Sequence, residues 1–155
     1  MQSPNAFPEL WKFGSHERAT RGTPLHLTAD CTASAGARRW STMRRIAVTS
    51  GYAVTAGQVL LITRVLYNAA TAGLTWEFSY GDTDVGRNGA AEPTNEVKLD
   101  AMIATTRNVL VALAANTLYD VPYYLEIPAG KYLTILHTNG SVQLWVAVFG
   151  HEVPA

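Results

Sequence analysis

Short apolar runs alternate with turn residues along most of this chain, and that spacing limits the folds open to it. The runs are rich in β-branched and aromatic residues, and Gly, Pro, Asn and Ser separate them at intervals of about ten residues. A parallel α/β sheet would need a helix between successive strands, and the sequence has room for only one. The chain is therefore predicted to be mainly β, an antiparallel β-sandwich with at most one short helix.

The periodicity within the runs shows which strands should be covered. In residues 74–80 large side chains occupy every second position (Leu74, Trp76, Phe78 and Tyr80), which predicts a half-buried strand with this face inward. Residues 58–67 are apolar at both parities, which is typical of a strand covered on both sides. Residues 25–29 and 42–49 are also predicted strands, the second with Arg44, Ile46 and Val48 on one face.

The last third of the chain predicts three strands, at 121–127, 131–138 and 142–150. The Asn139-Gly140 pair favours a tight hairpin, so the last two strands are expected to be antiparallel neighbours. The short Pro128-Ala129-Gly130 link suggests a third neighbour. Both faces of 142–150 are apolar, so one should line the core and the other needs a cover, which the N-terminal arm, a helix or another subunit could supply.

The middle of the chain is less regular. Residues 81–96 are polar and Gly-rich and are predicted to form a long exposed loop, a type of loop that is often functional or mobile. A helix is predicted over about 96–106, because apolar residues beyond the loop fall at helical spacing. The run Val109 to Val111 fits a strand equally well, so both readings stay open here.

The N-terminal segment differs from the rest. Residues 1–23 lack a sustained period and are predicted to be an extended arm, with residues 24–155 forming the β-sandwich domain. Large aromatic side chains need burial, so an arm that carries them is expected to dock on its own domain or on a neighbouring subunit. The residues concerned are Phe7, Leu10, Trp11 and Phe13.

Charge and hydropathy narrow the classes of partner. Lys plus Arg and Asp plus Glu number 12 each, so no global field attracts nucleic acid or an anionic membrane. Charged residues make up 15% of the chain against about 25% in typical proteins, which favours contact with protein partners. The chain begins without a basic stretch followed by an apolar run, and no segment has the ~18 apolar residues of a membrane helix, so neither a signal peptide nor a span is expected.

Residues that could carry chemistry do not form a recognised motif. Cys31 is the single cysteine, which excludes an internal disulfide and favours a small buried side chain. The histidines lack zinc spacing: His16, His26, His137 and His151. Asp82, Asp84 and Asn88 resemble a calcium loop, but Gly86 and Pro93 occupy liganding positions, so a solvated turn is favoured. No hydrolase motif occurs. The chain is expected to be non-enzymatic and to need neither cofactor nor metal.

One basic cluster is a candidate contact surface: Arg38, Arg39, Trp40, Arg44 and Arg45. Arginine pairs with carboxylates and stacks on aromatic rings, which suits a protein interface. A solvated strand edge protected by charge is an equal alternative. Tryptophans could also stack on sugar rings, but Trp76 shares the parity of Leu74 and Phe78 and should point inward.

The closing segment, Ile127-Pro-Ala-Gly-Lys-Tyr-Leu-Thr-Ile-Leu-His-Thr-Asn-Gly through Trp145-Val-Ala-Val-Phe-Gly-His-Glu-Val153, resembles the final strands of the decoration, or cement, proteins of tailed-phage heads. The resemblance implies a trimeric jelly roll on the outer surface of the capsid, made in the host cytoplasm. It also implies that the protein binds the major capsid protein and ties neighbouring capsomers together, with no catalytic residues. The alternatives are a carbohydrate- or receptor-binding module, and a tail or neck component.

Overall fold

The computed structural model describes residues 22–32, 38–70, 76–99, 115–137 and 143–155. These residues form strands and no helix, which confirms the predicted antiparallel β-sandwich. The strands are β1 (Thr23–Thr32), β2 (Arg39–Thr42), β3 (Arg44–Arg45), β4 (Gln58–Ala69), β5 (Trp76–Gly81), β6 (Val97–Lys98), β7 (Tyr119–Ile127), β8 (Tyr132–His137) and β9 (Gln143–Pro154).

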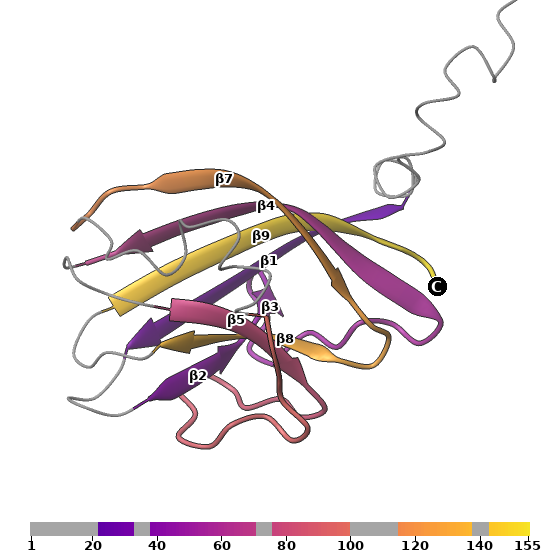
Figure 1. The fold of residues 1–155 in the computed structure, drawn as a ribbon, viewed down its shortest axis with the longest axis horizontal. Helices are drawn as coiled ribbons and strands as arrows, with labels where there is room; N and C mark the ends of the chain where they lie inside the picture. The colour runs from indigo at the N-terminus through magenta and orange to yellow at the C-terminus, as the bar shows by residue number, and fades with distance from the viewer. Residues whose placement is uncertain (1–21, 33–37, 71–75, 100–114, 138–142) are drawn as a thin grey trace, which may run out of the picture.

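The strands form two sheets that lie in separate layers (Figure 1). The large sheet has five strands in the order β3-β1-β9-β4-β7, and the small sheet has four in the order β2-β8-β5-β6. Apart from the two-residue β3, the antiparallel pairs are nested: β5 pairs with β6, β4 with β7, β2 with β8 and β1 with β9. Nested pairing of this kind, as in a strand hairpin rolled around a barrel, is the jelly-roll arrangement.

The core lies between the inward faces of the two sheets. Trp76 and Phe78 of β5 are fully buried, as the alternation of residues 74–80 predicts for the part that is described. The Trp76 ring packs edge-on against Tyr67 of β4 at a centroid distance of 5.1 Å, and Tyr67 stacks on Tyr119 at 4.9 Å. Burial, with the neighbouring Tyr119 and Tyr123, raises the pKa of Tyr67 to about 12. Each large side chain buried here contributes roughly 1.5–3 kcal/mol of hydrophobic stabilisation.

Strand β4 contains a bulge at which its side chains change face. The pairing register shifts between Ile62 and Arg64, where Thr63 is an extra residue relative to β9, while β7 has two residues opposite Thr63. The Thr63 hydroxyl lies 3.4 Å from the Phe149 carbonyl oxygen. The backbones approach so closely here that a Cβ on Gly150 would lie 2.1 Å from the Leu61 carbonyl oxygen. Glycine is therefore required at position 150 on steric grounds.

The bulge explains why residues 58–67 are apolar at both parities. Ahead of it Leu60 and Ile62 face the core, while the alternate residues Val59 and Leu61 face outward and are still buried. With Val153 of β9 they form a second apolar cluster, separate from the core. The prediction that this strand is covered on both sides is confirmed for its first half.

The prediction that the last three strands are neighbours in one sheet is wrong. β8 pairs with β2 and β5, whereas β7 and β9 both lie in the large sheet and are separated there by β4. In a jelly roll the chain also passes from one sheet to the other at short links, so a short connection does not by itself make two strands neighbours in one sheet. The Pro128-Ala129-Gly130 link makes this crossing, with Gly130 at a φ of 73°. Asn139-Gly140 lies outside the described residues.

Two other predicted elements are corrected. The strand expected at 42–49 is divided: β2 ends at Thr42 in the small sheet, Met43 is fully buried, and β3 joins the large sheet. The chain then turns at Ala47, which has a φ of 62°, so Ile46 and Val48 do not belong to a strand. The helix expected from residue 96 is contradicted where it is described, because Val97 and Lys98 pair with β5.

The boundary between arm and domain falls close to the start of β1. That strand begins at Thr23, and Gly22 lies against the end of β9, where an added Cβ would meet the Glu152 carbonyl oxygen at 2.5 Å. The remainder of the predicted arm lies outside the described residues.

Candidate binding surfaces

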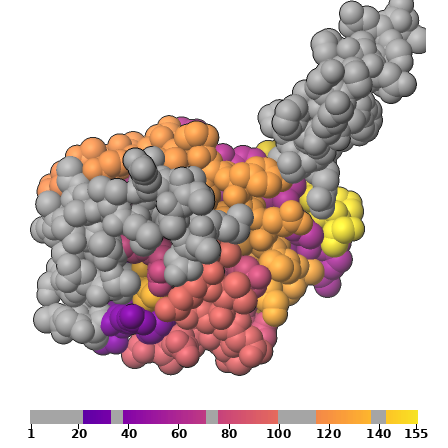
Figure 2. Space-filling model, viewed as in Figure 1, coloured from indigo at the N-terminus to yellow at the C-terminus, as the bar shows by residue number. Residues whose placement is uncertain are grey.

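The outward face of the small sheet is buried. Trp40, Thr42, Leu136, Ser79 and Thr134 all point outward from this sheet, yet each is at most 6% exposed. The loop 81–96 contributes to this covering: it runs along the free edge of β2 and forms part of a continuous surface at the bottom of the molecule (Figure 2). No open surface for a partner is left at these five side chains.

Backbone and side-chain bonds hold the loop against β2. The Trp40 N–H donates to the Gly89 carbonyl at 3.0 Å, the Gly89 N–H donates to the Trp40 carbonyl at 2.7 Å, and the Thr42 N–H donates to the Gly86 carbonyl at 2.8 Å. The Trp40 indole N–H donates to Glu96 Oε1 at 2.8 Å. The predicted loop is thus present, and it is anchored at several points.

The loop carboxylates resembling a calcium loop are hydrogen-bond acceptors within the fold. Asp84 accepts the N–H groups of Gly51 at 2.7 Å and Gly86 at 2.8 Å. Partial burial acts to raise the pKa of Asp84, but these two bonds outweigh it and hold the pKa below its ordinary value. Asp82 accepts from Asn95 at 2.7 Å and pairs with Lys131. Within the described ranges, no three His, Cys, Asp or Glu side chains group closely enough to hold a metal ion.

The predicted basic cluster does not form one surface. Trp40 is buried under the loop, whereas Arg44 faces outward from the large sheet and pairs with Asp30. Arg45 is exposed on the opposite side of β3, with its guanidinium 4.9 Å from the centre of the Tyr52 ring. Arg38 is exposed and Arg39 is half-buried. The other predicted contact residues, Phe7, Leu10, Trp11 and Phe13, lie outside the described residues.

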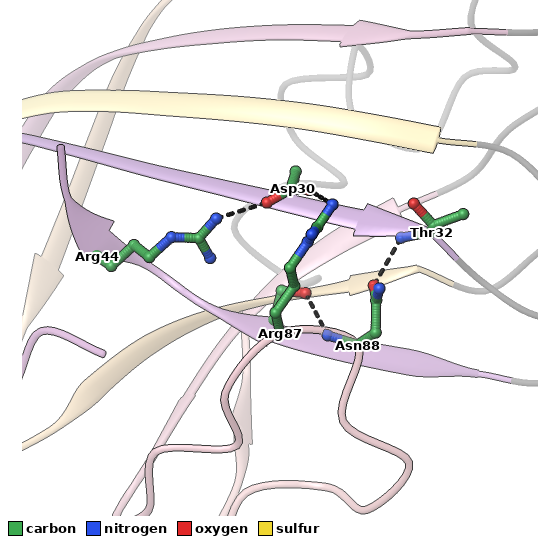
Figure 3. A network of polar contacts seen from close by, with 6 residues as sticks. Asp30, Thr32, Arg44, Arg87 and Asn88 are labelled. Atoms are coloured by element: carbon green, nitrogen blue, oxygen red, sulfur yellow. Dashed lines mark hydrogen bonds and ion pairs between the residues drawn. The ribbon is translucent and has the colours of Figure 1, made fainter. Parts of the chain in front are cut away.

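A network around Asp30 joins the large sheet to the loop (Figure 3). Asp30 of β1 lies between two guanidinium groups: Arg44 Nη2 is 2.6 Å from Oδ1, and Arg87 of the loop pairs with Oδ2. Asn88 adds a further tie, because its Oδ1 accepts the Thr32 N–H at 2.7 Å. The Asp30 side chain is only 13% exposed, so its charge is balanced largely by these two arginines.

Among the described residues, the outward face of the large sheet is open near one end. Trp145 of β9 has Asp30 of β1 on one side and Asn68 of β4 on the other as register partners. In the next outward row Ala147 lies between Thr28 and Leu66. A depression of about 330 Å³, which we name the Trp145 hollow, is lined by these six residues together with Arg44, Leu118 and the inward-facing residues of the same strands, Ala29, Tyr67 and Val146.

Strand β9 confirms part of the prediction made for residues 142–150. Leu144, Val146 and Val148 are buried in the core, as predicted for one face. On the other face Phe149 stacks on His26 at 4.2 Å and lies 5.4 Å from the Arg64 guanidinium, whereas Trp145 is 42% exposed. The alternation of β1 could have revealed the outward position of Asp30, but the pairing that places it beside Trp145 depends on tertiary structure.

A second exposed feature is the turn after β3, residues 45–48. The turn displays Ile46, which is 62% exposed, and Val48, which is 43% exposed. It is closed by a bond from the Val48 N–H to the Arg45 carbonyl at 3.1 Å. The following residues are fixed as well, since the Tyr52 N–H donates to the Met43 carbonyl at 2.8 Å. Two apolar side chains are therefore presented to solvent from a well-anchored turn.

Cys31 is fully buried, as predicted for a small apolar side chain. Burial, its largest influence, raises the pKa of the thiol, so the reactive thiolate is disfavoured near neutral pH. Its Sγ lies 3.6 Å from the Arg39 carbonyl oxygen. Within the described parts of the chain, no helix has the length and apolar character to cross a membrane.

Comparisons with known proteins yielded structural similarities of low score. No protein-family model and no curated protein matches the sequence. Among solved structures, a chain of infectious bursal disease virus strain Gx is similar, with a TM-score of 0.39 and 13% identity over 86% of this chain. For strain Gt the TM-score is 0.38, again with 13% identity, over 87% of this chain. This protein spans only 30% and 33% of those chains, and scores of this size assign neither fold nor function.

Proposed function

We propose that this protein is a non-enzymatic structural component of a virion that acts by binding other proteins, specifically a capsid decoration protein of a tailed phage. It would assemble as a homotrimer, bind the major capsid protein on the outer surface of the head, and tie neighbouring capsomers together. The sequence resemblance of its final strands to decoration proteins motivates the proposal, and the jelly-roll arrangement is compatible with it.

The observation that carries the protein-binding role is the turn 45–48. Ile46 and Val48 expose large apolar side chains on a backbone that the Val48 to Arg45 and Tyr52 to Met43 bonds hold in place. Because the turn is already ordered, a partner that covers it gains apolar contact without ordering a loop first. Arg45 adds a cation able to pair with a carboxylate at the rim of such a contact.

The arm would supply the second contact. Phe7, Leu10, Trp11 and Phe13 are the kinds of side chain that dominate protein interfaces when they enter a partner's pocket. A protein that binds only the assembled shell also stabilises that shell by mass action. The arm and the turn together would thus account for both attachment and stabilisation of a head.

The experiment is a binding titration on purified heads that lack the protein. We expect wild-type protein to bind saturably, the double variant Ile46→Ser/Val48→Ser to bind about tenfold or more weakly, and deletion of residues 1–21 to weaken binding as well. Val97→Ser is the matched control, because Val97 has the same 43% exposure as Val48 but lies on β6 of the small sheet. Circular dichroism would verify that every variant is folded.

Equal binding of the double variant and the Val97 control would remove the turn from the interface. Unchanged binding after deletion of residues 1–21 would remove the arm. Light scattering on the purified protein tests the trimer separately, and a monomer at micromolar concentration would contradict it. Electron microscopy of labelled virions decides between the head and a tail or neck position.

A further inference from the structure

The Trp145 hollow has the composition of a small-molecule site. Ala147, a small outward-facing residue next to the large Trp145 in the outward row of β9, lines the hollow. Leu66 extends the apolar surface on the β4 side. The volume of about 330 Å³ lies at the small end of the range for ligand sites, which matches one or two sugar rings better than a polypeptide segment.

Polar groups flank the exposed indole on both sides. Asp30 and Asn68 are the direct register partners of Trp145 on β1 and β4, and both line the hollow. Neighbouring strands lie about 4.8 Å apart, so the two side chains originate roughly 10 Å from each other with the indole between them. The carboxylate accepts hydrogen bonds, and the amide both donates and accepts them, which is what a ring of hydroxyl groups needs.

The Asp30 carboxylate is also fixed in place. The Asp30 carboxylate is held by Arg44 at 2.6 Å and by Arg87, so its oxygens have a defined direction before any ligand arrives. A carboxylate oxygen has more than one acceptor direction, so these ion pairs leave capacity for a hydroxyl donor. Among the residues that line the hollow, Asp30 carries one negative charge and Arg44 one positive charge, so the described lining is neutral overall and suits a neutral ligand.

From this arrangement we propose that the Trp145 hollow binds a neutral saccharide, with the apolar C–H face of a hexose against the Trp145 indole and its hydroxyl groups on Asp30 and Asn68. The indole supplies apolar contact area, and the flanking groups supply direction and selectivity. This activity is additional to the assembly role, since the hollow lies on the outward face of the large sheet and does not include the turn 45–48. It places sugar recognition at Trp145 and not at Trp40, which is buried.

The test uses the full-length protein on an array of neutral glucose-, galactose- and mannose-containing oligosaccharides, printed together with sialylated and sulfated counterparts. We expect binding to at least one neutral oligosaccharide, followed by a calorimetric titration with that compound. Trp145→Ala should weaken binding by roughly tenfold or more, and Asn68→Ala should weaken it less, because one hydrogen-bonding group is lost while the stacking surface stays.

Tyr124→Ala is the matched control. Tyr124 is exposed to nearly the same extent as Trp145, at 43% against 42%, and lies on β7 of the same sheet but is not part of the hollow. Binding should be unchanged in this variant. The proposal is overturned if no neutral oligosaccharide binds at millimolar concentration, if charged glycans bind better than neutral ones, or if Trp145→Ala binds as well as Tyr124→Ala.

Discussion

The outward faces of the two sheets differ in how they are covered. On the small sheet Trp40 is 6% exposed, its backbone is paired with Gly89, and its indole is bonded to Glu96 of the loop 81–96. On the large sheet Trp145 occupies a comparable outward position, yet it is 42% exposed beside an open hollow. One tryptophan stabilises the fold and the other is available to a ligand.

The difference shows that the alternation of side chains along a strand predicts which face of the sheet a residue lies on, but not whether that face is covered. Trp40 and Trp145 both point away from the core, and neither position alone shows whether a loop will cover it. The deciding contacts come from residues far along the chain, such as Glu96, which is 56 positions from Trp40.

The largest predicted difference between the two tryptophans is in their contribution to the stability of the fold. Trp40→Ala should lower the free energy of unfolding by about 3–5 kcal/mol, because it leaves a cavity and frees Glu96, whereas Trp145→Ala should cost less than about 1 kcal/mol. Urea unfolding followed by circular dichroism measures both. If the two variants lost similar stability, the two faces would not differ as described.

An intermediate effect is expected at the network that joins the large sheet to the loop. Asp30→Asn should cost about 1–3 kcal/mol, because Arg44 and Arg87 lose the charge between them in a site where the carboxylate is 13% exposed.

Asp120→Asn is the matched control for this substitution. Its pair with Arg64 lies on the same sheet with both side chains about half exposed, so solvent screens it and the loss of stability should be clearly smaller than for Asp30→Asn. Equal losses in the Asp30 and Asp120 variants would argue against a special role for the network in holding the loop.

The smallest effect concerns pH. The folded state lowers the pKa of Asp84, so the unfolded chain binds the proton more readily than the folded one. The stability that ionised Asp84 contributes is fully present above its ordinary pKa of about 4, and it is lost as pH falls through the lower pKa of the folded state. Asp84→Asn should therefore flatten the loss of stability between about pH 5 and pH 3, by less than about 1 kcal/mol after solvent screening. Urea midpoints over this pH range would reveal the change, and parallel curves for variant and wild type would contradict it.

The sequence predicted the fold class and most strands because both follow from local alternation and turn residues. Trp76 and Phe78 point inward, Leu144, Val146 and Val148 line the core, and Cys31 is buried, all as their patterns indicated. What failed was pairing: the last three strands were expected to be neighbours, but the crossing at Pro128 to Gly130 sends β8 to the other sheet. A short link fits a hairpin and a crossing equally well, so local signals do not separate them.

The candidate site was predicted less well, for a related reason. The basic cluster at 38–45 spans a change of sheet at Met43, which distributes its side chains to different surfaces. Conversely, Asp30, Asn68 and Trp145 are far apart in sequence and meet only because β1, β9 and β4 are adjacent in the large sheet. Closeness in the sequence therefore grouped residues that lie on different surfaces of the fold. It could not group the residues of the hollow, which are far apart in the sequence.

The bulge at Thr63 lies between two regions of the outward face of the large sheet. Near Val59 the outward side chains are buried in an apolar cluster, whereas near Asn68 the neighbouring Trp145 is 42% exposed beside the hollow. Because the bulge reverses the alternation, Leu60 and Ile62 face the core ahead of it, and Val65 and Tyr67 face the core after it. Strand β4 thus supplies core residues along its whole length, while the outward face of the sheet is buried at one end of the strand and exposed to solvent at the other.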